Sequence, residues 1–186
     1  MMDQFLEEVV VKHKTGARTV LIAACNGLMV LFALFAFIFL NTTINAVFTV
    51  GFSVDLLLPL FTFGICLAGA IYLFLNKDKL NTEYEYTFTN GVLDFAQVFN
   101  NKRRKALGTM NLRNIEACGM VTSGSFQRYI SMPGIQRTHW FLNREADLMY
   151  LYFNKEGNKR IIIIEPSEQM RKYIKGALSQ GVWQEN

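Results

Sequence analysis

Two long apolar runs in the first half of the chain constrain its fold more than any other feature. Residues 19–40 and 54–75 are each 22 residues long, and the only charge in either is Asp55, at the edge of the second run. A bilayer core about 30 Å thick needs about 20 helical residues, so both runs have the length of a membrane span. The sequence therefore predicts transmembrane helices at 19–40 and 54–75, joined by an extracytoplasmic loop at 41–53.

Basic residues flank the predicted hairpin and are missing from its loop. Lys12, Lys14 and Arg18 precede the first run, and Lys77 and Lys79 follow the second. The positive-inside rule then places both flanks in the cytoplasm. We expect a multi-pass protein of the cytoplasmic membrane with cytoplasmic N- and C-termini.

The segments next to the spans carry weaker signals. In residues 1–18, the spacing of the apolar side chains fits a short interfacial helix, or a frayed cytosolic extension of the first span. Within the spans, small residues recur four apart, as at Ala23 and Gly27 and at Gly64 and Ala68. Such residues let helices approach closely, and packing within the hairpin accounts for them.

Residues 81–186 read mainly as strands and are predicted to form a separate cytoplasmic domain. The segment 84–89 alternates aromatic with polar side chains, which is typical of a half-buried strand. Asn90-Gly91 follows, a strong signal for a tight hairpin turn into a strand at 92–99. Further strands are expected at 105–112, 115–121, 148–153 and 160–164, the last two forming a hairpin around residues 155–158.

One amphipathic helix is predicted at the end of the domain, at about 167–179. Ser167 follows a proline and is a suitable N-cap, and Glu168 lies in the first turn. Apolar side chains then recur at helical spacing, with the charged residues largely on the other side. The predicted class is thus a transmembrane hairpin joined to a mainly-β domain that this helix covers.

This order of elements resembles the pleckstrin-homology-like (PH-like) fold. The segment 84–93, with its Asn-Gly turn, and the run 161–166 leading into a helix are similar to bacterial PH-like domains that follow two transmembrane helices. The resemblance covers residues 84–178 and implies a bent seven-strand sandwich closed by the C-terminal helix. Relatives that bind phosphoinositides place basic residues in the first hairpin loop, whereas the turn here has no Lys or Arg.

A cluster of four basic residues is the first candidate site. It is formed by Lys102, Arg103, Arg104 and Lys105. Near an anionic leaflet, each basic residue contributes about 1 kcal/mol, so the cluster is a candidate membrane-surface contact. The alternative is a solvated loop between strands. Nucleic acid is not expected as a partner, because the cluster lacks interleaved aromatic residues for base stacking.

The second candidate site is the irregular stretch 122–146. Aromatic and arginine side chains dominate protein interfaces, and they also cap cores. A strand is also possible here, around 127–131 or 139–142. The candidate partner contacts in this stretch are Phe126, Arg128, Tyr129, Arg137, His139 and Trp140.

Catalytic patterns are not recognisable in the sequence. No metal-ligand spacing, phosphate-binding loop or nucleophile elbow occurs, so no cofactor, metal or small-molecule substrate is expected. A nucleophile–base pair of Cys118 and His139 is a remote enzymatic alternative. We predict a non-enzymatic, membrane-anchored scaffold that binds a protein partner or forms a homo-oligomer, with binding of an anionic membrane surface as the alternative.

Overall fold

The computed structural model describes residues 4–13 and 16–185 and divides into two compact units. The helical unit spans residues 14–81, and the β-rich unit combines the N-terminal residues up to His13 with residues 82–186. Lys14, one of the flanking basic residues, lies outside the described residues. The β-rich domain therefore does not begin at residue 81, as the sequence suggested, but is assembled from both sides of the hairpin.

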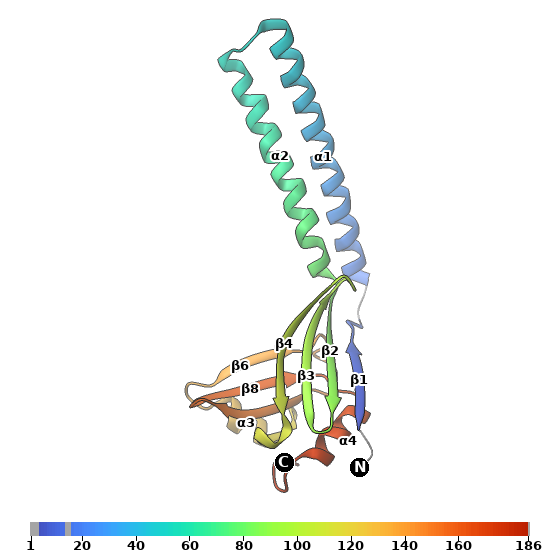
Figure 1. Ribbon diagram of the computed structural model, residues 1–186, viewed down its shortest axis with the longest axis vertical. Coiled ribbons are helices and arrows are strands. Elements are labelled where there is room, and N and C mark those ends of the chain that lie inside the picture. Colours follow the sequence, from blue (N-terminus) through green and yellow to red (C-terminus); the bar gives the residue numbers. More distant parts are fainter. Residues whose placement is uncertain (1–3, 14–15, 186) are drawn as a thin grey trace. The chain divides into compact units, whose positions relative to one another are not determined.

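The helical unit contains two helices that are long and apolar enough to cross a membrane. They are α1 (Gly16–Val50) and α2 (Leu57–Asn76), with 3-10 turns η1 (Val54–Leu56) and η2 (Lys77–Leu80) on either side of α2 (Figure 1). Most of their apolar side chains are exposed on the protein surface. Exposed apolar surface of this extent is what the lipid-facing sides of membrane spans require.

The predicted loop at 41–53 is wrong for most of its length, because α1 continues to Val50. The polar residues after the span are accommodated within the helix: the hydroxyls of Thr42 and Thr43 each donate to the carbonyl one turn earlier, at 2.7 Å. At 1.5 Å per residue α1 is about 52 Å long, so it exceeds the bilayer core of about 30 Å. The link between α1 and α2 shortens to residues 51–56, of which 54–56 form η1.

The two helices approach closely at Gly69, which the sequence analysis did not single out. A Cβ atom on Gly69 would lie 3.3 Å from the Phe32 ring, whereas nothing lies within 4 Å of the corresponding position on Gly27. Replacing Gly69 by Ile should force the helices apart and destabilise the hairpin by about 1–3 kcal/mol. The melting temperature of the full-length protein in one detergent measures this loss. The matched Gly27→Ile change should leave it unaltered, and equal effects of the two changes would contradict the packing described here.

The first sheet of the β-rich unit contains the N-terminal segment as a strand. Its order is β1 (Phe5–Val10), β2 (Thr82–Thr89), β3 (Val92–Phe99) and β4 (Arg103–Asn111), all antiparallel. Residues 5–10 are thus not an interfacial helix. Their apolar pattern suits either structure, and pairing with β2 over six residues decides it, burying Val10 while Val9 stays exposed. Figure 1 shows β1 beside β2.

The second sheet is built from the rest of the chain, in the order β6-β8-β7-β5-β9. Its strands are β5 (Ile115–Met120), β6 (Gln136–Trp140), β7 (Met149–Lys155), β8 (Asn158–Ile164) and β9 (Trp183–Gln184). The 3-10 turn η3 (Leu112–Asn114) connects β4 to β5. The irregular stretch contributes β6, but its residues 124–130 form helix α3 (Gly124–Ile130), so a strand at 127–131 is wrong.

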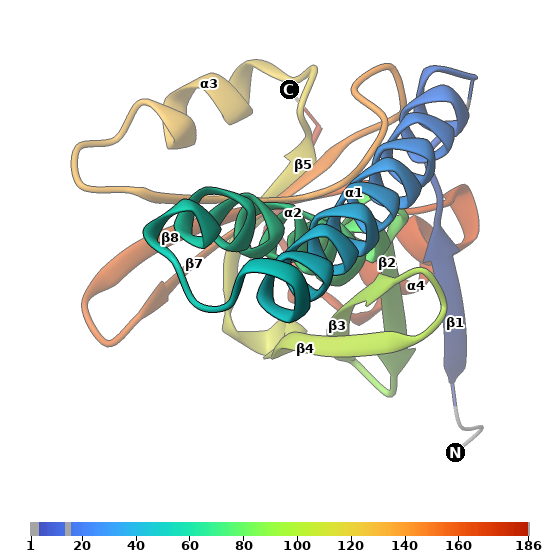
Figure 2. The same cartoon turned by 90° about the horizontal axis from the view of Figure 1, so that it is seen from above.

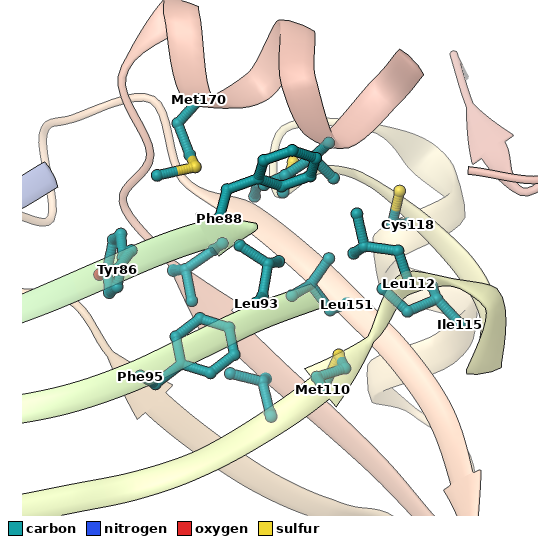
Figure 3. Close-up of a cluster of buried hydrophobic side chains, with 14 of the residues drawn as sticks. Tyr86, Phe88, Leu93, Phe95, Met110, Leu112, Ile115, Cys118, Leu151 and Met170 are labelled. Atoms are coloured by element: carbon teal, nitrogen blue, oxygen red, sulfur yellow. The ribbon is translucent and has the colours of Figure 1, made fainter. Parts of the chain in front are cut away.

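The main core lies between the two sheets and under helix α4 (Glu168–Ala177). Phe88, Leu93 and Leu151 are fully buried, and Met170 of α4 packs onto them (Figure 3). Ser167 caps α4 by accepting a hydrogen bond from the Met170 amide at 3.2 Å. The cap and the helix are confirmed, although the helix ends two residues earlier than predicted.

A second cluster covers the opposite face of the second sheet. There α3 places Phe126 against Tyr150, with ring centroids 5.5 Å apart. Figure 2 shows α3 well separated from α4. Residues alternate between the faces of a strand, so Leu151 and Ile162 serve the main core while Tyr150 and Ile161 serve the second.

Tight turns join the hairpins. Asn90 and Gly91 both have positive φ (48° and 85°), as do Glu156 and Gly157 (53° and 80°). These values match the turn type that suits the twist of a two-residue hairpin, so both predicted turns are confirmed. A third turn, at Asn100 and Asn101 (φ 52° at each), connects β3 to β4.

Candidate functional site

A groove of about 610 Å³ separates two strand edges of the β-rich unit. Among the described residues, β4 pairs only with β3 and β6 only with β8, so the sandwich is open between β4 and β6. We call this the edge groove. It is lined by Phe95, residues 107–111, Asn114, Thr138, Trp140, residues 153–155, Arg160 and Ile162. Its volume lies within the range of about 300–1,000 Å³ found for ligand sites.

The groove has an aromatic floor. The rings of Phe95 in β3 and Trp140 in β6 lie against each other at a tilt of 46°, with centroids 4.8 Å apart, and Phe95 also meets the Tyr86 ring edge-on at 5.7 Å. Gly108 of β4 lies above this floor, because a Cβ there would be 3.9 Å from the Trp140 ring. The floor is therefore part of the main core.

The wall formed by β4 has an unpaired backbone edge. A β-bulge next to Phe95 leaves Leu107 as an extra residue, and its half-buried side chain lines the groove. Proteins commonly protect such edges with charged residues. The first part of β4 does carry charges, Arg103 to Lys105, but residues 106–111 have none. This uncharged half is the part that borders the groove.

The charges that line the groove are all positive. They belong to Lys155 and Arg160, and none of the described lining residues is acidic. The Nε atom of Arg160 is buried and has no hydrogen-bond partner in the described part of the chain. Buried polar groups in proteins are normally paired, so this nitrogen is an exception among the described residues.

The basic cluster at 102–105 lies elsewhere. It belongs largely to β4, so the alternative of a solvated loop between strands is wrong for three of its four residues. Arg104 forms an ion pair with Glu85 (2.6 Å), and Arg103 lies over the Phe99 ring at 5.2 Å. Because Phe99 pairs with both Thr82 and Arg103, the cluster lies at the end of the sheet where β2 begins.

The six candidate partner contacts fall into two groups. Phe126, Tyr129 and Trp140 pack in the cores, Tyr129 on the Tyr152 ring at 4.6 Å. The remaining three are exposed: Arg128 lies over Tyr129, Arg137 donates to the Ile130 carbonyl at 2.8 Å, and His139 stands edge-on to Phe141. The aromatic residues of the stretch therefore have packing roles, and only Trp140 lines the edge groove.

A buried carboxylate network holds β6 and the end of β1 in place. Glu165, only 8% exposed, accepts hydrogen bonds from the amides of Leu142 (3.1 Å) and Asn143 (2.9 Å) and from the Asn143 side chain (2.7 Å). Asn143 in turn donates to the Val11 carbonyl and accepts from the His13 amide. Sequence reasoning missed this network, and its one local signal was a glutamate directly after an isoleucine run.

Tyr86 extends the network to the groove floor. Its hydroxyl donates to the Trp140 carbonyl and accepts a hydrogen bond from the Glu165 amide at 3.3 Å. Burial raises the pKa of Tyr86 well above its usual value of about 10, so the hydroxyl remains a donor. The hydrogen bond from Tyr86 thereby holds the backbone of Trp140, and with it the aromatic floor, in position.

Cys118 and His139 are not brought together. Cys118 is fully buried on β5, and burial raises the pKa of its thiol to about 12. His139 is exposed on β6, with β8 and β7 between the two strands. At about 4.8 Å per strand they are roughly 14 Å apart, which rules out a nucleophile–base pair.

Comparison with known families decides what this domain is. Residues 2–184 match the family described as bacterial PH-like domain (DUF6106). The chain belongs to this family. No curated protein and no solved structure matches the chain. The resemblance drawn from residues 84–178 is thus confirmed, and the match shows that the family extends over β1 and both candidate spans as well.

The PH-like domain of this chain is interrupted by its membrane hairpin. The hairpin leaves from β1 and returns at β2, two neighbouring strands of one sheet. The Asn90–Gly91 turn therefore belongs to the second hairpin of the sheet, not to the first as the resemblance had implied. The connection between the first two strands is the pair of apolar helices itself.

Proposed function

We propose that this protein is a non-enzymatic, membrane-anchored interaction module whose PH-like domain binds a protein partner at the cytoplasmic face of the cytoplasmic membrane. The single observation that carries the proposal is the edge groove, where an uncharged, unpaired strand edge borders an aromatic floor and two cations. Open strand edges are sites at which proteins capture extended segments of other proteins.

The topology supports a domain on one side of the membrane. Because β1 and β2 are paired, the chain before the first span and the chain after the second must lie on the same side. Lys12, Arg18, Lys77 and Lys79 flank the hairpin, which favours the cytoplasmic side. Both termini are then cytoplasmic.

In-cell photo-crosslinking tests this function. A photoreactive phenylalanine analogue is placed in the full-length chain at Thr109 in the groove, and in parallel chains at exposed Glu116, Arg137 and Lys159. We expect a discrete adduct with another protein from at least one of these positions, absent without ultraviolet light. Adducts with lipid or with a second copy alone, at all four positions, would contradict a protein-partner role.

A second candidate function, contact with an anionic membrane surface, is favoured by the position of the basic cluster. Lys102 to Lys105 lie at the sheet end where β2 begins, two residues after η2. Arg104 is already paired with Glu85, so its charge is partly neutralised within the domain. The sequence alone overstates the charge of the basic cluster, because it does not show that Arg104 is paired with Glu85.

Neutralising the other three residues tests the surface contact. In anionic nanodiscs, amides 100–105 of the full-length protein should exchange hydrogen more slowly than in zwitterionic ones. Changing Lys102, Arg103 and Lys105 to Gln should abolish this difference in exchange rate. Each of these residues contributes about 1 kcal/mol of attraction to an anionic surface. High salt should also abolish the difference, because screening weakens surface attraction. Exchange that is insensitive to lipid charge would exclude this contact.

A further inference from the structure

We propose that the edge groove binds an extended, acidic segment of the partner protein, which adds to β4 as a further strand and places a carboxylate against Arg160 and Lys155. This inference rests on the proposed function, because it names the class of partner segment and its site. It is carried by three properties of the groove: its backbone edge, its charge and its distance along β4 from the basic cluster.

The backbone edge selects an extended polypeptide. In an edge strand, alternate residues direct their N–H and C=O groups away from the sheet, and a second strand satisfies them. Residues 107–111 present such groups to the groove, over roughly 17 Å of strand at 3.4 Å per residue. A peptide of about five residues matches this length. A compact ligand such as phosphate would leave most of the edge unused.

The charge selects an acidic segment. Lys155 and Arg160 line the groove without an acidic neighbour in it, and within the described residues neither forms an ion pair with a carboxylate. Hydrogen bonds from arginine to carboxylate are among the stronger ones in proteins, because both partners are charged and the guanidinium is planar. Three asparagine amides in the lining add further donors.

The position of the cations favours a protein over a lipid surface. Ile115, just beyond β4 and η3, pairs with Phe153, which neighbours Asn154 and Lys155. The cationic part of the groove therefore lies towards the Asn111 end of β4. Arg103, at the other end, lies eight residues away, roughly 27 Å along the strand. The Arg103 end of β4 is the end next to the start of β2, and β2 follows the spans directly in the chain.

Selection from a peptide library tests the proposal on the full-length protein in detergent micelles. Phage that display random eight-residue peptides are selected on the wild-type protein, and the enriched peptides are synthesised. We expect enrichment in Asp and Glu, with loss of about tenfold or more in affinity for Arg160→Ala, the size of one charge-assisted hydrogen bond. Lys159→Ala, on the neighbouring exposed residue of β8, is the matched control and should bind as wild type.

Two further measurements locate the site. On peptide binding, backbone amides of residues 106–111 should become protected from hydrogen exchange, as strand addition requires. Gly108→Leu should block binding, because a Cβ at Gly108 meets the Trp140 ring at an ordinary 3.9 Å, the residue has no positive φ, and a larger side chain there would occupy the groove. The melting temperature of this variant should match that of the wild type. Since this variant does not touch Arg160, it keeps the test informative even if Arg160→Ala lowers stability.

Several outcomes would overturn the proposal. They are enrichment without acidic residues, equal affinity for wild type and Arg160→Ala at equal melting temperature, or protection outside β4. Displacement of the peptide by inorganic phosphate at low millimolar concentration, or by phosphatidylglycerol vesicles, would point to an anion or lipid site instead. If crosslinks in cells come only from Glu116, Arg137 or Lys159, the interaction function stands and the edge groove is not its site.

Discussion

Deleting residues 4–13 is expected to unfold the β-rich domain, although these residues lie before the membrane hairpin and far from the rest of the domain in sequence. β1 contributes six paired residues to the first sheet and buries Val10. Burying one such side chain is worth about 1.5–3 kcal/mol, and each backbone hydrogen bond adds about 1 kcal/mol. The sum is comparable with the whole stability of a domain, about 5–15 kcal/mol.

Polar contacts of β1 increase the expected effect. Glu8 accepts a hydrogen bond from the Ser167 amide at the start of α4 (2.8 Å), and the Val11 carbonyl accepts from Asn143. Without the N-terminal segment, the Ser167 amide and the Asn143 side chain lose an acceptor, and the edge of β2 loses its neighbouring strand. A fragment containing only residues 82–185 should therefore aggregate or show no cooperative melting.

A rearranged chain provides the control for this prediction. In it, a glycine–serine linker of about six residues replaces residues 14–81, so that β1 continues directly into β2 as a hairpin. This soluble chain should melt cooperatively, and scrambling its residues 5–10 should abolish the transition. Cooperative melting of the 82–185 fragment at the same temperature would show that β1 is dispensable.

Replacing Glu165 by Ala is expected to lower the free energy of unfolding by about 3–5 kcal/mol, which is the second large effect. The change leaves two partly buried amides and the Asn143 side chain without their acceptor, and each unsatisfied buried donor costs about 1–3 kcal/mol. The loop after β6 and the end of β1 should loosen together, because both depend on Asn143. Thermal or denaturant unfolding of the full-length protein, followed by tryptophan fluorescence, measures the loss.

Two comparison variants make this result specific. Glu165→Gln keeps the shape and one acceptor oxygen, so its effect should be smaller. Glu116→Ala removes an exposed glutamate from β5 and should change stability by less than about 0.5 kcal/mol. A loss for Glu165→Ala no greater than for Glu116→Ala would mean that the network contributes little to the fold.

The candidate site could not be predicted from sequence for a specific reason. The basic cluster and the aromatic residues of 122–146 drew attention because they are dense in the sequence, yet Arg104 is paired and Phe126 and Trp140 are packed in cores. The edge groove combines residues of β3, β4, β6, β7 and β8 that carry no shared spacing. Arg160 was read only as the start of a strand.

The sequence by itself determined the features that depend on neighbouring residues: the two spans, the hairpin turns at Asn90–Gly91 and Glu156–Gly157, and the cap of α4 by Ser167. Length, φ preference and a side chain three residues from its acceptor are local properties, which a window of sequence contains. The bacterial PH-like resemblance followed from the order of such elements.

Tertiary structure alone decided the placement of residues 5–10, because their apolar pattern suits a helix or a strand equally well. The free edge of β2, more than 70 residues later, provides the partner that makes them a strand. The tertiary structure likewise decided which polar groups lie together, as with Glu165 and Asn143, and which strand edges stay open. Pairing between distant segments depends on what the rest of the chain leaves unsatisfied, and no local pattern encodes that.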